Sequence, residues 1–598
     1  MTLFFKLFVG TLTFFCFLDA QDNQIFIGSL NLEGNKNVSL NEVLLIVRQR
    51  PPSLFSRKTE FDSRLMRLDA LTIKNYYFSK GFLDVNIDED YTIQDQQSKN
   101  KYVDLLYKIE EGKQYFLSSI ELSGNNLLPD SQIKDLLGLE INAPYNPVGL
   151  NDKLYLLENE YQKKGKVFSS ISVSDKINET AKVKIDIEEG RSYYINNTII
   201  KGIGNIDSSI VYRELDYKPG QLYSKTKIDN SLKKIREIGI FSTANITPIK
   251  TIDSDSLVNL IIQLRRYKQR EWISSGGYEP FSFAEGAPEL PAISGTIEWR
   301  NRAFLNSSKQ FAVKLLFGIP VEVDFVTPRL RYDASLSSNW FFGYRFPTTF
   351  TGYFEKFIIY EEKDYKESID RYGANMVQHI QLKGRSYFES KSLWENFGDA
   401  SEENIQERSI SLKLVYDIRD DPLFTKRGFL INFLYKFAGF GGSREYTKAD
   451  LTIQSYQAIF KETVLAARLQ FGNLWKWDSN YNDYSFEKFY LGGSTSMRGW
   501  EVLRFSENDQ NEPNGETLRI MTNMEIRQKV YKSFGMTLFA DGGLLSTSLP
   551  NNIINELKWD LGVGVTFDTP LGPLRLDYAA QVNDLNTRLI NIGIQNLF

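Results

Sequence analysis

One stretch of the sequence, residues 491–500 (LGGSTSMRGW), places a fixed positive charge on a glycine-rich segment between strand-like segments. The charge belongs to Arg498, whose guanidinium stays protonated in proteins. Two acids, Glu525 and Asp541, follow on downstream strand-like segments. A buried cation is costly unless it is paired. The chemistry offered by these residues is therefore a buried ion-pair cluster, not bond making or bond breaking.

The composition argues against most catalytic chemistry. Among 598 residues there is one histidine, His379, and one cysteine, Cys16. This excludes a His/Cys zinc cluster and leaves no histidine base for a serine or cysteine nucleophile. There is also no G-x-S-x-G elbow and no P-loop, and the net charge of −4 gives no basic footprint for nucleic acid. We therefore expect no enzyme, no metal, no cofactor and no nucleic-acid partner.

The first 20 residues predict a signal peptide. One lysine precedes an apolar run at residues 7–18, and Ala20 is a small residue suited to cleavage. Cys16 raises the alternative of a lipoprotein signal, which Phe15 and Thr13 disfavour. The run is short for a transmembrane helix, and no later segment has 18 uncharged apolar residues. If the protein spans a membrane, it must do so as a closed barrel.

A pattern of strand, two helices and two strands occurs three times between residues 24 and 270. In each copy a Gly-Asn pair follows the first strand, and a second glycine ends the second helix in a left-handed cap. These glycines are Gly34, Gly124 and Gly204, then Gly81, Gly165 and Gly239. The first two copies end in Glu-Glu-Gly and the third has Arg265-Arg266 instead. The order resembles POTRA domains, with generic βααββ domains as the alternative, and we place them at residues 24–115, 116–192 and 193–270.

From residue 271 to 598 the sequence alternates with a period of two. Residues 410–419 put apolar side chains on one face and polar ones on the other, and the pattern recurs at 534–541, 574–580 and 589–598. Such alternation, rich in aromatic residues, is typical of a transmembrane β-barrel. The length fits about 16 antiparallel strands, with a loop inserted into the lumen around residues 491–515. A large soluble β-sandwich is the alternative.

Four motifs strengthen the barrel prediction. They are DIRDDPLFTKRG (residues 417–428), LGGSTSMRGW (491–500), FADGG (539–543) and GVGVTFDTPLGPLRLDY (562–578). Together they resemble the bacterial surface-antigen barrel of the BamA/TamA outer-membrane assembly family. Three repeats are closer to TamA than to BamA, which usually has five.

The resemblance implies a role for the MRGW segment. In that family the sixth extracellular loop folds into the barrel and carries a V/I-R-G-Y/F motif, which Arg498, Gly499 and Trp500 match with small departures at the flanks. The family's arginine meets acids on interior strand positions, and the strand phase puts Glu525 and Asp541 on the lumen side. We expect these five residues to form a loop latch. Ordinary lumen polarity, wetted by water, is the alternative.

A weak seam is expected where the first and last barrel strands meet. The first strand contains Ser274, Ser275, Gly276 and Gly277, and the last contains Gly593. Glycine and serine give little side-chain packing to fix the register. Lateral opening would expose an edge for an incoming strand, and a disulfide between residues 275 and 593 would test this.

The final segment, LINIGIQNLF, ends in an aromatic residue. Alternation predicts that Ile590, Ile592, Ile594 and Phe598 share the outward face. This resembles the C-terminal signal by which outer-membrane barrels are recognised for insertion.

The resemblance implies an outer-membrane assembly factor whose POTRA domains lie in the periplasm. Its partners would be unfolded outer-membrane proteins or autotransporters, outer-membrane lipid, and a periplasmic protein, either TamB-like or an assembly lipoprotein. A two-partner secretion transporter is one rival, although it normally carries two repeats and a plug helix. A passive porin or receptor is the other, although it needs no repeats.

Overall fold

The computed structural model describes residues 25–52, 59–94, 101–252, 254–278, 292–320, 329–362, 365–398, 404–460, 462–477, 487–509, 511, 513–531, 533–569, 572–594 and 598. The signal peptide expected at residues 1–20, with Cys16, lies outside them. The chain divides into two compact units. The first comprises Met1–Ile199, Leu215–Leu232 and Ile246–Ile262, and the second comprises Ile200–Glu214, Lys233–Asn245 and Gln263–Phe598.

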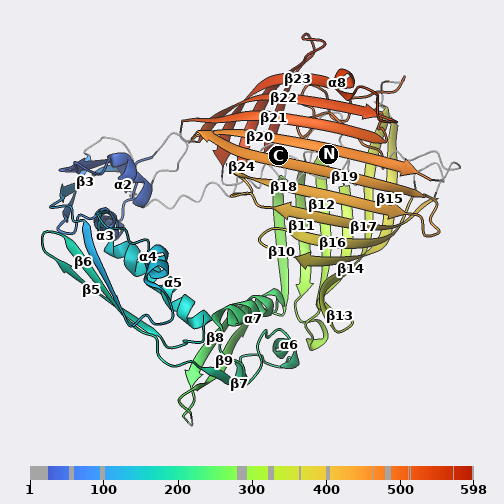
Figure 1. Ribbon diagram of the computed structural model, residues 1–598. Coiled ribbons are helices and arrows are strands. Elements are labelled where there is room, and N and C mark those ends of the chain that lie inside the picture. Colours follow the sequence, from blue (N-terminus) through green and yellow to red (C-terminus); the bar gives the residue numbers. More distant parts are fainter. Residues whose placement is uncertain are drawn as a thin grey trace. The chain divides into compact units, whose positions relative to one another are not determined.

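Each of the three repeats forms its own three-stranded sheet, as predicted. The orders are β1-β3-β2, β4-β6-β5 and β7-β9-β8, so the last strand of each repeat is central (Figure 1). The bounds in the first repeat are β1 Ile25–Glu33, α2 Leu40–Ile46, α3 Ser63–Ser79, β2 Asn86–Gln94 and β3 Lys101–Glu110. Those in the second are β4 Leu117–Ser123, α4 Asp130–Leu137, α5 Pro147–Lys163, β5 Ser170–Ile177 and β6 Ala181–Glu188. Those in the third are β7 Tyr194–Lys201, α6 Ser209–Tyr212, α7 Lys225–Glu237, β8 Phe241–Lys250 and β9 Leu257–Arg266.

The helices of each repeat cover one face of its sheet. In the first repeat, α3 buries Ile73 and Tyr77 in a core shared with Val103 and Leu105 of β3. Within the described ranges, no helix has the length and apolar character needed to cross a membrane.

One glycine in each repeat lets the end of the first strand pass close to the central strand. A Cβ at Gly34, Gly124 or Gly202 would lie 2.0 or 2.1 Å from a main-chain oxygen of that strand. All three have positive φ, which favours glycine. The predicted equivalence of Gly204 is therefore wrong, because Gly202 takes that position. A Cβ at Gly204 would instead approach the guanidinium of Arg266.

The Glu-Glu-Gly ending of the first repeat binds the loop that follows its first strand. The Glu111 carboxylate accepts hydrogen bonds from the main-chain N–H groups of Lys36 (2.7 Å) and Asn37 (2.8 Å) and from the Tyr77 hydroxyl (3.0 Å). Glu189 accepts from a main-chain N–H of the equivalent loop in the second repeat. The acidic ending thus holds the loop onto the sheet in both repeats.

We predict that Glu111→Gln lowers the free energy of unfolding of the first repeat by about 1–3 kcal/mol, because it removes charge-assisted hydrogen bonds. Burial raises the pKa of Glu111, but the hydrogen bonds from Asn37, Lys36 and Tyr77 outweigh burial and lower the pKa below its ordinary value. Such a carboxylate adds stability above the pKa of the unfolded chain and loses it as the pH falls through the folded pKa. Pulse proteolysis in urea at pH 7 and pH 4, following the fragment that contains residues 25–112, measures this. Equal urea midpoints for both proteins at pH 7 would contradict it.

The rest of the chain forms one antiparallel sheet of 16 strands, ordered from β10 to β25 without a crossover. Figure 1 shows these strands following one another around a curved sheet, from green to red. The predicted count of about 16 is confirmed, and β10 and β25 are the two ends of the order. The bounds are β10 Arg270–Tyr278, β11 Ala292–Asn301, β12 Gln310–Pro320, β13 Arg329–Phe341, β14 Tyr344–Glu362, β15 Tyr365–Gln381, β16 Tyr387–Gly398, β17 Asn404–Asp417, β18 Gly428–Ala438, β19 Tyr446–Phe460, β20 Thr463–Lys476, β21 Leu518–Tyr531, β22 Phe534–Ser546, β23 Lys558–Thr569, β24 Gly572–Gln581 and β25 Arg588–Ile594, with short helices η1 Phe304–Asn306 and α8 Ile553–Glu556.

The two faces of this sheet differ in polarity. On β17 the side chains of Ile410, Leu412, Leu414 and Tyr416 are 39% to 43% exposed, whereas Ser411 between them is buried. Buried polar and charged residues on the inner face recur along the other strands. This is the apolar-out, polar-in alternation of a membrane barrel.

Candidate functional site: a loop bound inside the sheet

The connection between β20 and β21 turns back along the inner face of the sheet. Its two legs are joined by main-chain hydrogen bonds between Phe489 and Glu516, at 2.8 and 3.0 Å. Above this base, Leu491, Met497 and Phe505 form a small buried cluster with a residue of β21. The loop is therefore packed into the protein and presents residues 494–499 to the strands β20–β25.

The guanidinium of Arg498 is fully buried among acids. Two of its nitrogens donate to Asp541, each at 2.8 Å, and the third donates to Glu525 at 2.7 Å and to Asp577 at 3.4 Å. The ring of Phe539 lies under the cation, with its centre 3.4 Å from the guanidinium carbon. Arg498 thus combines charge-assisted hydrogen bonds with a cation–π contact.

The strand pairing explains why these acids meet. Asn523 of β21 lies opposite Asp541 of β22, and Glu525 is two residues from Asn523 on the same face. The structure therefore brings Arg498, Glu525 and Asp541 together. Asp577 was not predicted, although the same alternation in PLRLDY marks it as an interior residue.

Gly499 binds the wall through its main chain. Its N–H donates to Asp560 at 2.8 Å, and its carbonyl oxygen accepts from Gln581 at 2.9 Å. A Cβ at Gly499 would lie 2.6 Å from the Cβ of Asp560. Trp500 packs instead against Phe505, with ring centres 4.9 Å apart. Asp560 is a second acid that the sequence analysis missed.

We predict that Gly499→Ala destabilises the bound loop by about 1–3 kcal/mol, because the added methyl group overlaps Asp560. Cleavage of the loop by an external protease should become faster, while the folded barrel persists on a semi-native gel. Gly352→Ala on β14 is the matched control, since a Cβ there meets no atom within 4 Å. Equal cleavage rates for the two variants would contradict the prediction.

Of three further arginines beside the loop tip, two bind it directly and two pair with the acids. Arg468 donates to the carbonyl oxygen of Thr495 and Arg575 to that of Ser494, both at 3.0 Å. Arg575 also binds Asp577 at 2.7 Å, and Arg527 binds Glu525 at 2.7 Å. Four arginines therefore stand beside four acids in one cluster: Arg468, Arg498, Arg527 and Arg575 with Glu525, Asp541, Asp560 and Asp577.

A second buried cluster holds the base of the loop. Lys436 of β18 and Lys448 of β19 lie directly opposite each other, an arrangement of like charges that is unfavourable by itself. Glu487 of the loop contacts both ammonium groups, at 3.3 and 3.4 Å, and Glu407 contacts that of Lys436 at 2.6 Å. The ring of Phe489 lies 4.8 Å from the ammonium of Lys448. The alternation marks the lysines as interior, but only the path of the loop reveals Glu487.

The expected seam residues lie on the two terminal strands. Ser274, Ser275, Gly276 and Gly277 are exposed on β10, and the Ser275 hydroxyl is 2.6 Å from that of Thr296. Gly593 of β25 has a different surrounding. A Cβ there would lie 2.7 Å from a guanidinium nitrogen of Arg575. A cysteine at residue 593 would therefore have to move the Arg575 guanidinium before it could form the disulfide with residue 275.

The predicted outward position of Phe598 is wrong. Ile590 and Ile592 are exposed as expected, at 69% and 68%. The Phe598 ring instead packs near Tyr456, Val464 and Ala466, which are buried side chains of β19 and β20. The role of Phe598 in the C-terminal signal for insertion stays a prediction.

The described residues contain no group of three histidine, cysteine, aspartate or glutamate side chains arranged to hold a metal ion. The clustered acids bind arginines and main-chain N–H groups. The site is therefore built for holding a segment of the chain in place.

Comparison with known proteins agrees with this arrangement. Residues 309–596 match the Omp85 superfamily domain, and residues 25–112, 115–190 and 193–265 match the surface antigen variable number repeat, or POTRA. The outer membrane protein assembly factors BamA of Nitratidesulfovibrio vulgaris and of Neisseria meningitidis are 22% and 20% identical, over 94% and 88% of this chain and 71% of each relative. The chain spans 36% of a relative from Treponema pallidum.

A solved structure shares the fold. BamA from Haemophilus ducreyi, lacking POTRA domains 1–3, superposes with a TM-score of 0.58 at 13% identity, covering 81% of this chain and 98% of that one. The closer likeness to TamA by repeat number stays a prediction. The chain is an outer-membrane protein with periplasmic POTRA repeats, and it belongs to the Omp85 superfamily.

Proposed function

We propose that this protein inserts unfolded outer-membrane proteins into the membrane through a seam between β10 and β25. The proposal rests on the place of these two strands in the sheet and on their serine and glycine residues. The two strands end the sheet order, β10 presents four exposed serine and glycine residues, and β25 contains Gly593. The names of the curated relatives as outer membrane protein assembly factors support the same activity.

An open strand edge supplies the chemistry. Unpaired N–H and C=O groups of a terminal strand template an incoming strand by β-augmentation. In a bilayer every main-chain polar group needs a partner within the protein, so pairing is strongly favoured. The free energy then comes from pairing and from placing apolar side chains in lipid, with no nucleotide, cofactor or catalytic step.

The repeats would receive clients on the periplasmic side. We propose the division into POTRA domains at residues 24–115, 116–192 and 193–270 and a barrel from residue 271. Each repeat has an edge strand, such as β2 in the first. These edges suit unfolded outer-membrane proteins or autotransporters, and a periplasmic partner that is TamB-like or an assembly lipoprotein. The cluster around Arg498 would act as the latch that keeps the loop inside the barrel.

Crosslinking the seam tests the route. Ser274→Cys paired in turn with Ile590→Cys and Ile592→Cys uses outward positions on both strands, which avoids Arg575. We expect the oxidised pair to abolish client insertion and reduction to restore it, with each single cysteine as control. A fully crosslinked barrel that still inserts clients would rule out the seam.

Depletion followed by a census of outer-membrane proteins identifies the clients. Loss of many barrel proteins indicates a general insertase, and loss of a few indicates an accessory factor. Loss of one secreted protein, with all barrels intact, would favour the rival two-partner secretion transporter.

A further inference from the structure

Phe598 is bound inside the sheet by two arginines. Arg527 donates to its main-chain oxygen at 3.1 Å, and the guanidinium carbon lies 5.0 Å from the centre of the ring. Arg468 lies 5.1 Å from the same ring centre. The ring of Tyr456 is 6.1 Å away. These distances are those of cation–π and aromatic contacts.

Arg468 binds the loop tip directly, and Arg527 shares Glu525 with Arg498 of the loop. One oxygen of Glu525 accepts from Arg498, and the other accepts from Arg527, each at 2.7 Å. Arg468 donates to Asn523 at 2.9 Å and to the carbonyl oxygen of Thr495 at 3.0 Å. Each arginine therefore has the loop network on one side and Phe598 on the other.

We propose that Arg527 and Arg468 are positioning residues that couple the loop tip to Phe598. The loop orients both guanidinium groups through Glu525 and Thr495, and Phe598 binds them in that orientation. Phe598 follows β25, which ends at Ile594, so the loop tip stabilises the end of the closing strand from inside. The coupling concerns the sheet alone and holds whatever the client is.

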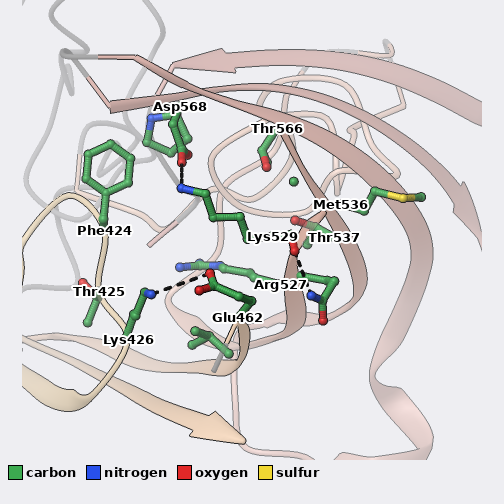
Figure 2. Close-up of a pocket in the computed structure, with 14 residues that line it drawn as sticks. Phe424, Thr425, Lys426, Glu462, Arg527, Lys529, Met536, Thr537, Thr566 and Asp568 are labelled. Atoms are coloured by element: carbon green, nitrogen blue, oxygen red, sulfur yellow. Dashed lines mark hydrogen bonds and ion pairs between the residues drawn. The ribbon is translucent and has the colours of Figure 1, made fainter. Parts of the chain in front are cut away.

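A pocket lies beside Arg527, on the side of its two neighbouring ion pairs. Arg527 lines a pocket of about 300 Å³ together with Val464 and Thr537. Figure 2 shows Arg527 between two ion pairs, Lys426 with Glu462 and Lys529 with Asp568. The pocket shares Val464 with the surroundings of Phe598.

Hydrogen exchange of the full-length protein in detergent micelles tests the coupling in both directions. Arg498→Ala should speed exchange in the peptide covering residues 588–598, and Phe598→Ala should speed exchange in residues 490–505. Thermodynamic linkage requires the two increases in exchange rate to be equal, and we expect each increase to be about fivefold or more. Arg527→Gln should speed both and keeps Phe598 in the chain, so it provides the comparison if Phe598→Ala does not assemble.

Lys529→Gln is the matched control. It lies two residues from Arg527 on the same face of β21, lines the same pocket, and binds Asp568. Unchanged exchange at residues 588–598 in Arg498→Ala would overturn the proposal. Equal effects of Lys529→Gln and Arg527→Gln on exchange at residues 588–598 would also overturn it. A purely structural role for Arg527 would raise exchange throughout β21 and β22 without reciprocity between the two ends.

Discussion

Arg498→Ala is expected to release the loop tip while leaving the barrel folded. Removing one partner of a buried ion pair costs about 3–5 kcal/mol, because the remaining charges stay buried. Asp541 loses more hydrogen bonds than the other acids, because it accepts two from the guanidinium group. Cleavage of the loop by protease added to intact cells should rise at least about tenfold, and client insertion should fall more than the amount of folded barrel.

Two comparisons make this result specific. Arg504→Ala removes a partly exposed arginine of the same loop that pairs with Glu501 and Glu507 and donates to the carbonyl oxygen of Asn511. These contacts lie away from the acids around Arg498, so the cleavage rate should rise much less than in Arg498→Ala. Arg498→Lys keeps the charge but cannot reach three acids at once, so it should give an intermediate rate. The base of the loop stays bound by Glu487 in all three variants. An unchanged cleavage pattern in Arg498→Ala would refute the latch.

Asp541→Lys is expected to prevent barrel assembly, whereas Asp541→Asn weakens only the latch. Asp541 is fully buried, and a cation in its place would face Arg498 with no acid between them. Asparagine keeps an acceptor, and it also removes repulsion with Asp560, which lies directly opposite on β23. We expect the folded fraction, scored by heat-modifiable gel mobility, to fall at least about tenfold for lysine, a cost above about 1.4 kcal/mol.

The control for charge reversal is Asp568→Lys. Asp568 shares the inner face of β23 but pairs with Lys529 and is partly exposed. Water can solvate a lysine there, so the barrel should assemble. If Asp541→Lys assembled as well as Asp568→Lys, the cluster would not be a requirement for folding.

The alternation of side chains accounts for what the sequence could predict. A period of two determines which face each residue takes, and it placed Glu525 and Asp541 on the lumen side. The resemblance, not the alternation, implied that the loop brings Arg498 to the same side. The alternation also reaches Asp560 and Asp577, which share the interior phase of their strands. They lie on the third and fourth strands after the loop, and alternation does not predict that one cation reaches acids across four strands.

Other features depend on tertiary structure. The contact of Glu487 with Lys436 and Lys448 requires the path of the loop and the register of β18 on β19. The contacts of the Phe598 ring with Arg468 and Arg527 also depend on tertiary structure and do not follow from alternation. In the third repeat two glycines fit the local pattern, and only the close approach to β9 selects Gly202.

The missing side chain of Gly593 makes the inner surface of β25 a size filter. Arg575 occupies the space where a Cβ would project, and it binds Ser494 of the loop tip from there. A foreign strand that paired with β24 in place of β25, with any larger residue at this register, would displace Arg575. Exchange of the last strand would then remove the contact between Arg575 and Ser494, one of the several that hold the loop tip.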